Sequence, residues 1–131
     1  MNVAPGTSAQ VETTVGSHQT ADALGNPGVQ AFATPFVIGL LENASSAVLR
    51  AHLPPGSGTV GTMVEIRHLA ATPVGMKVTG RATLLETDGR RFLFAVDAWN
   101  ELEKIAEGRH ERYLVSDMKK FLDRAMHKGR T

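Results

Sequence analysis

Three side chains that could perform acid–base or hydroxyl chemistry stand in apolar surroundings: Thr34, Glu42 and His68. Glu42 is the only charged residue between Ala31 and Leu49. Burial of an unpaired carboxylate costs free energy, so an acid in such a segment either has a partner or does chemistry. The alternative is a narrow solvent-facing stripe that Glu42 would share with Asn43, Ser45, Ser46 and Arg50.

The segment that carries Glu42 is predicted to be a helix. Thr34 can cap the free N–H groups of a helix start, and Pro35 is tolerated at the first helical position. The helix should run from Pro35 to about His52 and stop before Pro54-Pro55. Its low charge indicates a helix that is buried nearly all round, as it would be if a sheet wrapped it. The apolar positions recur with the i, i+3, i+4 spacing of a helix: Phe36, Val37, Leu40, Leu41, Ala44, Ala47, Val48 and Ala51.

His68 lies in a predicted strand that spans Thr59 to Ala71. Strict alternation places it on one face of this strand with Val60, Thr62, Val64 and Ile66, and this apolar face should point inward. A lone inward histidine is often only a hydrogen-bonded core residue. If the sheet covers the helix that carries Glu42, however, the two side chains form a candidate acid–base pair.

Thr34 has two compatible interpretations. It can be a simple helix cap, or its hydroxyl and the helix N-terminus can stabilise an oxygen that becomes negative during a reaction. Thr34 and Glu42 are eight residues apart, about 12 Å along a helix axis. We therefore hypothesise a site shared across a two-fold interface, in which one chain supplies Glu42 and another supplies the helix start.

The rest of the chain predicts β-structure and a terminal helix. One short strand, 11–15, precedes the long helix, and three long strands follow the one that carries His68. They span 76–86, 91–100 and 104–115, with Asp88-Gly89 as a hairpin turn between the first two. Ser116-Asp117 should cap a short basic amphipathic helix. The fold class is therefore α+β, with one antiparallel sheet of about five strands wrapped around a long central helix, plus a short C-terminal helix. Residues 1–131 form a single domain, with residues 1–9 disordered.

The composition argues against several classes of function. Fourteen Lys and Arg residues balance thirteen Asp and Glu residues, so no strong field attracts nucleic acid or an anionic membrane. The chain has no cysteine, which excludes disulfide scaffolds and thiol catalysis. We find no signal peptide and no apolar run long enough to span a bilayer, and we expect a cytoplasmic protein. Gly56-Ser-Gly-Thr-Val-Gly61 matches a dinucleotide-binding pattern in letters only, because a strand and not a helix follows it.

Three spaced motifs resemble a known family. Thr34-Pro-Phe-Val-Ile-Gly-Leu-Leu-Glu42 and Gly61-Thr-Met-Val-Glu-Ile-Arg-His68-Leu-Ala-Ala-Thr-Pro-Val-Gly75 are similar to segments of the fluoroacetyl-CoA thioesterase family of hot-dog proteins. Gly108-Arg-His-Glu-Arg112 resembles the last strand of that family. The resemblance implies that Thr34, Glu42 and His68 are catalytic and that Gly61 and Arg112 contact the acyl-thioester substrate.

The resemblance also sets the expected reaction, the hydrolysis of an acyl-CoA to the free acid and CoA by a homodimer or a larger assembly. Glu42 would act as nucleophile or as general base, and Arg112 would bind substrate, orient Glu42 or form a strand-edge salt bridge. No metal or cofactor is expected besides the CoA thioester substrate. The alternatives are an acyl-thioester hydratase or dehydratase of the same fold and a non-catalytic acyl-CoA-binding dimer. The segment 21–30 lacks the phenylalanines of the family's substrate lid, so we expect the chemistry to be shared but not the fluoroacetyl specificity.

Overall fold

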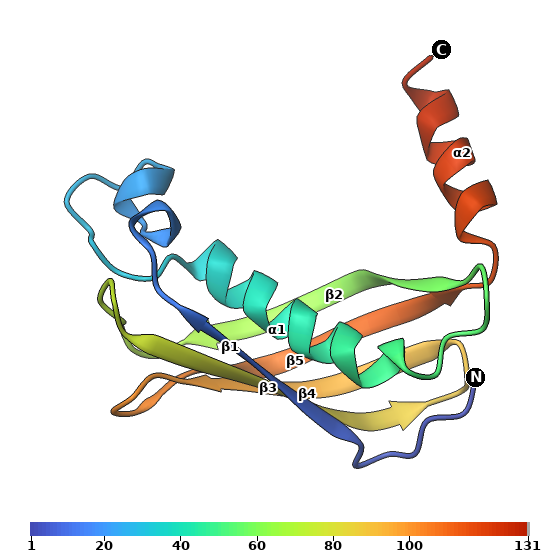
Figure 1. Cartoon of the computed structure of the whole chain (residues 1–131), viewed down its shortest axis with the longest axis horizontal. Coiled ribbons are helices and arrows are strands. Elements are labelled where there is room, and N and C mark those ends of the chain that lie inside the picture. Colours follow the sequence, from blue (N-terminus) through green and yellow to red (C-terminus); the bar gives the residue numbers. More distant parts are fainter. Residues whose placement is uncertain (131) are drawn as a thin grey trace.

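An antiparallel five-stranded sheet curls around one long helix (Figure 1). The computed structural model describes residues 1–130. The strands follow the order β1-β3-β4-β5-β2 across the sheet, so β1 and β2 form its two edges. Their bounds are Ser8–Thr14 for β1, Gly58–His68 for β2, Lys77–Thr87 for β3, Arg91–Trp99 for β4 and Lys104–Val115 for β5. Helix α1 spans Thr34–Arg50, and α2 spans Met118–Lys128.

The hydrophobic core lies between α1 and the concave face of the sheet. The central strand β4 is buried along most of its length, and its residues Phe92, Phe94 and Val96 are all in the core. The bounds predicted for β5 are confirmed. Gly89 has φ +94° in the β3–β4 hairpin, a backbone conformation that glycine adopts without steric cost.

The N-terminal segment is ordered along the sheet, in contrast to the predicted disorder of residues 1–9. The side chain of Val3 is buried, and the Gly6 N–H donates a hydrogen bond to the Leu84 carbonyl. β1 starts three residues earlier than predicted. Its side chains alternate between exposed and half-buried, which made the strand harder to recognise from its sequence.

Helix α1 is amphipathic rather than buried all round. One face is packed against the sheet and contains Val37, Leu40, Leu41, Ala44, Ser45, Val48 and Leu49. The opposite face is open, and Asn43 on it is exposed. The prediction of a fully wrapped helix was therefore wrong for a single chain. Most residues of the open face are small or uncharged, so the sequence lacks the row of charged residues that normally marks the exposed side of a helix.

A β-bulge interrupts β2 near its middle. Gly61 pairs with Arg112, but Met63 pairs with Glu111, so Thr62 is an extra residue in the ladder. The extra residue changes which side chains of β2 face inward before the bulge, and the Thr62 hydroxyl contacts Glu111 on the outer face of the sheet. The predicted inward placement of Val60 and Thr62 was therefore wrong, because a bulge re-aims the side chains on one side of it.

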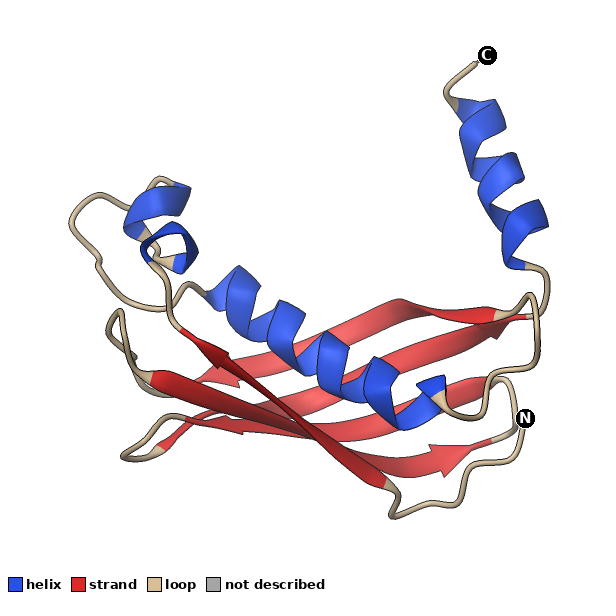
Figure 2. Ribbon diagram, in the orientation of Figure 1, coloured by secondary structure: helices blue, strands red, loops and turns tan. Residues whose placement is uncertain are grey.

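Two segments extend beyond the sheet and α1 (Figure 2). Between β1 and α1 the chain forms two short 3-10 helices, Ser17–Gln19 and Asp22–Leu24. At the other end, α2 projects away from the end of β5, with Asp117 as the N-cap that accepts a hydrogen bond from the Lys120 N–H. None of its side chains is buried. No helix in the described part of the chain is long and apolar enough to cross a membrane.

Candidate active site

Thr34 and His68 meet at the N-terminus of α1. The Thr34 Oγ1 and His68 Nδ1 atoms are 2.8 Å apart and hydrogen-bonded. Thr34 is the first residue of the helix, Ala33 is the N-cap, and no side chain caps this end. The predicted cap was therefore wrong, and the hydroxyl is instead directed to the imidazole of the last residue of β2.

The other nitrogen of His68 is buried and unpartnered. Nε2 has no hydrogen-bond partner among residues 1–130. Burial lowers the pKa of His68, and the nearby backbone of Ala70 partly opposes this effect. His68 is therefore neutral at pH 7 and can accept or transfer a proton. It lines a cavity of about 340 Å³ with Thr34 and with small or aliphatic residues that include Ala21, Val29, Ala31 and Ala71.

Glu42 lies near the middle of α1, opposite the β2 bulge. A Cβ atom placed on Gly61 would lie 2.8 Å from Glu42 Oε2, so the carboxylate lies directly over the backbone of this glycine. The Glu42 side chain is 44% exposed, which contradicts the predicted burial. Glu42 lines a cavity of about 250 Å³ with Gly61, Thr62, Met63, Val64 and His110.

Arg112 approaches Glu42 from β5. Its Nη1 lies 3.8 Å from Glu42 Oε2, while Nε and Nη2 donate to the hydroxyl and carbonyl oxygens of Thr59. Because β5 lies between β4 and β2, Arg112 is on an interior strand, and the predicted alternative of a strand-edge salt bridge is wrong. Burial lowers the pKa of Arg112, and Glu42 opposes that effect. The two hydrogen bonds to Thr59 hold the guanidinium beside the Glu42 carboxylate.

His110 is a further polar residue of this cluster, and the sequence argument did not single it out. It is 1% exposed, and its Nε2 lies 3.3 Å from Arg112 Nη1. In the sequence it stands two residues before Arg112, on the same face of a strand. This period-two spacing was the available signal.

The two clusters are separate within one chain. Glu42 lies about 12 Å along the helix from Thr34, and His68 lies seven residues along β2 from Gly61, roughly 20 Å in an extended strand. The predicted pair of Glu42 and His68 is therefore not formed within a single chain. No group of three or more His, Cys, Asp or Glu side chains in the described range could hold a metal ion.

The arrangement of sheet and helix matches thioesterases of known structure. A hypothetical protein from Thermus thermophilus, a thioesterase superfamily member, is 31% identical, with a TM-score of 0.87 over 98% of this chain and 96% of that one. The fluoroacetyl-CoA thioesterase FlK is 32% identical, with a TM-score of 0.89 and coverage of 98% of both chains. A crystal structure of a point mutant of FlK contains fluoroacetate and CoA. The predicted hot-dog thioesterase fold is confirmed.

The sequence comparisons narrow this class to one family. Residues 15–118 match the model of the fluoroacetyl-CoA-specific thioesterase family. The fluoroacetyl-CoA thioesterase of Streptantibioticus cattleyicolor is 40% identical over 86 residues, which span 66% of this chain and 62% of that enzyme. The chain belongs to the fluoroacetyl-CoA-specific thioesterase family, a family of thioester hydrolases, as its motifs predicted.

Proposed function

We propose that this protein hydrolyses an acyl-CoA thioester to the free acid and CoA, as a homodimer whose two chains each contribute part of one reaction centre. Thr34 and His68 come from one protomer, and Glu42, Gly61 and Arg112 come from its partner. The observation that carries the proposal is the buried, unpartnered Nε2 of His68, which is hydrogen-bonded through Nδ1 to Thr34 beside a cavity. Family membership supports the class of reaction.

The separation of the two clusters supports the shared site. Each cluster lacks a group that the other contains. Among residues 1–130, no carboxylate is paired with the imidazole of the Thr34 cluster, and the Glu42 cluster has no hydroxyl at a helix N-terminus. The open face of α1 and the free edge of β2 lie on the surface of a single chain. In a two-fold contact, a residue away from the axis faces a different residue of the partner chain. A contact across this surface therefore brings the Thr34 cluster of one chain to the Glu42 cluster of the other.

The proposed reaction assigns one role to each group. Glu42 either attacks the thioester carbonyl or removes a proton from the attacking water, and the carbonyl oxygen becomes negative. The Thr34 hydroxyl and the Gly61 backbone support that oxygen. On the general-base route, the proton removed from water passes through His68 to the departing thiolate as the C–S bond breaks, which yields CoA and the acid. On the nucleophilic route, C–S cleavage leaves an anhydride of Glu42, and water hydrolyses it to the acid while His68 moves a proton from that water to the thiolate. Arg112 holds Glu42 in place. No metal or redox cofactor takes part in this scheme.

We expect a broader acyl range than fluoroacetyl. The segment 21–30 lies over the cavity beside Thr34 and places Ala21, Asn26 and Val29 in its lining. The aromatic side chain of this lining is Phe32. Small and aliphatic walls recognise an acyl chain by its size rather than by a polarised fluorine atom.

The direct test is thiol release from a panel of short, branched, aromatic and long acyl-CoAs. Hydrolysis predicts one free thiol and one carboxylic acid for each thioester consumed. Loss of 2-enoyl absorbance without thiol release would show a hydratase instead, and binding without turnover would show a non-catalytic protein. Either result would refute the proposed reaction.

A second test addresses the shared site. In an equal mixture, Thr34→Ala and Glu42→Ala chains, each inactive alone, should regain about a quarter of wild-type activity, because about half of the dimers are mixed and one of the two sites in each mixed dimer is intact. The control mixes Thr34→Ala with His68→Ala, which lie in the same half and should not complement. Absence of recovery in verified mixed dimers would refute a shared site but not hydrolysis.

A further inference from the structure

The buried imidazole of His110 has a polar partner at each ring nitrogen. Nδ1 lies 2.9 Å from the Met63 carbonyl oxygen, and Nε2 lies 3.3 Å from Nη1 of Arg112. A carbonyl oxygen can only accept a hydrogen bond, and a guanidinium can only donate one. Both contacts therefore require the same tautomer, with the proton on Nδ1 and a free lone pair on Nε2.

This tautomer places His110 between the β2 bulge and the guanidinium. Met63 directly follows the extra residue of the bulge, and Gly61 directly precedes it. A Cβ on Gly61 would lie 3.0 Å from His110 Cε1, so the ring also packs against the glycine backbone. One side chain thus contacts the bulge on both sides of Thr62.

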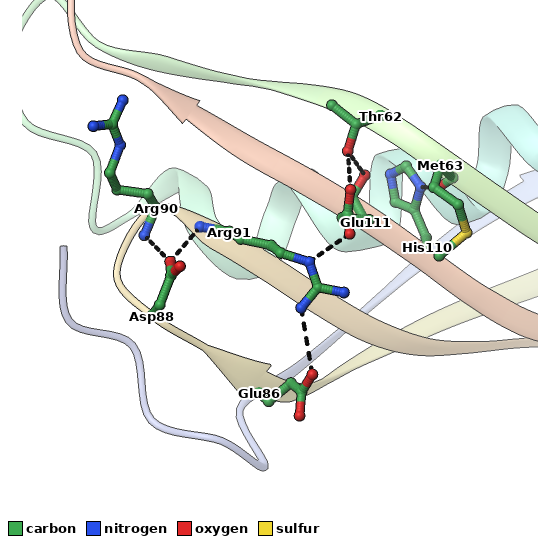
Figure 3. A network of polar contacts seen from close by, with 8 residues as sticks. All are labelled: Thr62, Met63, Glu86, Asp88, Arg90, Arg91, His110 and Glu111. Carbon is green, nitrogen blue, oxygen red and sulfur yellow. Dashed lines mark hydrogen bonds and ion pairs between the residues drawn. The ribbon is translucent and has the colours of Figure 1, made fainter.

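The outer face of the sheet holds the same bulge by other contacts (Figure 3). The Thr62 hydroxyl donates to Glu111 Oε1 at 2.6 Å, and Arg91 Nε donates to the other carboxylate oxygen of Glu111. His110 and Glu111 are neighbours on β5 and point to opposite faces of the sheet. They fix the bulge from the two sides, and only His110 also reaches the Glu42 cluster.

We propose that His110 is a positioning residue for the reaction: its Nδ1–H holds the Met63 carbonyl and its Nε2 accepts from Arg112, so that Arg112 and the Gly61 backbone are fixed around Glu42. This inference rests on the proposed function of Glu42. His110 acts through Arg112 and the bulge and does not itself touch the substrate.

The charge state of His110 agrees with this role. Burial lowers its pKa, the Met63 carbonyl raises it, Arg112 lowers it and Glu42 raises it, with a net decrease. A neutral ring at pH 7 keeps the Nε2 lone pair available to Arg112. A protonated ring would instead place an N–H against the guanidinium and break the contact.

Three substitutions separate the two hydrogen bonds of the ring. His110→Gln can keep an acceptor near the Nε2 position, His110→Asn can keep a donor near the Nδ1 position, and His110→Phe keeps the ring volume but neither bond. We expect kcat to fall about 10- to 100-fold in the Phe variant, because displacements of about 1 Å have costs of this order. The Gln variant should recover most of the lost kcat and the Asn variant less, with KM changed less than kcat in all three.

A double-mutant comparison tests the route through Arg112. In an Arg112→Lys background, His110→Phe should reduce kcat by less than threefold, because the contact it removes is already lost. Val96→Ala is the control, since it alters a buried residue of the neighbouring strand that pairs with Gly108 and not with His110. Equal kcat losses in the presence and absence of Arg112, or Tm losses with unchanged kcat in every His110 variant, would overturn the positioning role.

A measurement on the wild-type protein keeps this inference distinct from the proposed reaction. Nitrogen-15 NMR of the imidazole at pH 7 should show a protonated Nδ1 and an unprotonated Nε2. The opposite tautomer, or an imidazolium, would overturn the inference even in an active enzyme. If no thioester is hydrolysed, the proposed function fails, and positioning for that reaction fails with it whatever tautomer is found.

Discussion

Gly61→Ala tests the geometry around Glu42 most directly. The added methyl would lie 2.8 Å from Glu42 Oε2, 3.0 Å from His110 Cε1 and 3.6 Å from Arg112 Nη1. To restore an ordinary contact of 3.4 Å, the carboxylate must move by about 0.6 Å, the difference between 2.8 and 3.4 Å. The half-exposed carboxylate can move, whereas the His110 ring is buried and bonded at both nitrogens.

The expected result is loss of activity without loss of fold. A displacement of about 0.6 Å at a reacting group should lower kcat about 10-fold or more, since displacements near 1 Å cost about 100-fold. The free energy of unfolding should change by less than about 1 kcal/mol, because the lower backbone entropy of the unfolded alanine chain offsets part of the crowding. Thiol release under single-turnover conditions gives the rate, and urea unfolding gives the stability.

Gly58→Ala is the matched control on the same strand. Its methyl would also be crowded, at 2.5 Å from Met118 Cε, but that atom is the free end of a flexible side chain outside the site. We expect kcat within about twofold of wild type. A Gly61→Ala protein that is folded and has wild-type kcat would refute the proposal that the Glu42 carboxylate, where it lies above the Gly61 backbone, is part of the reaction centre.

Three further predictions concern other parts of the molecule. Thr34→Ala should lower kcat about 100-fold if its hydroxyl supports the oxyanion. In urea unfolding, its free energy of unfolding should fall by less than the ~1 kcal/mol typical of a lost cap, since this hydroxyl does not cap α1. A larger loss of stability would contradict that geometry. Leu41→Ala, at a fully buried position of α1, should destabilise the fold by about 2–5 kcal/mol in the same assay, and a loss below 1 kcal/mol would argue against the described core. Burial lowers the pKa of both His68 and His110, so below about pH 6.5 the unfolded chain binds protons that the folded chain does not, and stability falls as the pH decreases from that value. Between pH 7.5 and pH 5.5, the free energy of unfolding in urea should decrease less for His110→Gln than for wild type or for the exposed control His127→Gln. An equal decrease would contradict the result expected for His110.

Much of the fold could be predicted from residue patterns. The long helix with its 3.6-residue period, the strand that begins at Arg91 and the Asp88-Gly89 turn each depend on neighbours in the sequence, and each was confirmed. The β2 bulge was missed because a single extra residue leaves no mark in a two-residue period. It becomes visible only when β5 is placed alongside and the pairing shifts between Gly61 and Met63.

The candidate residues could be selected from the sequence, but their geometry could not be predicted. Glu42 stands out because it is the only charged residue between Ala31 and Leu49, and the strand pattern placed His68 on the inner face. Their separation within one chain depends on how α1 crosses the sheet, which the sequence pattern does not encode. His110 went unnoticed because the role proposed for it depends on contacts with Met63 and Arg112 across two strands.

The terminal helix α2 has a separate consequence for experiments on this protein. It has eleven residues, none of them buried, and helices this short are marginal in water by themselves. Its backbone amides should exchange with deuterium much faster than those of β4, because local opening there does not require the core to separate. A dye attached to this helix would therefore not report global unfolding, and any slowing of exchange along it would report a molecule bound against its exposed Phe121 and Leu122.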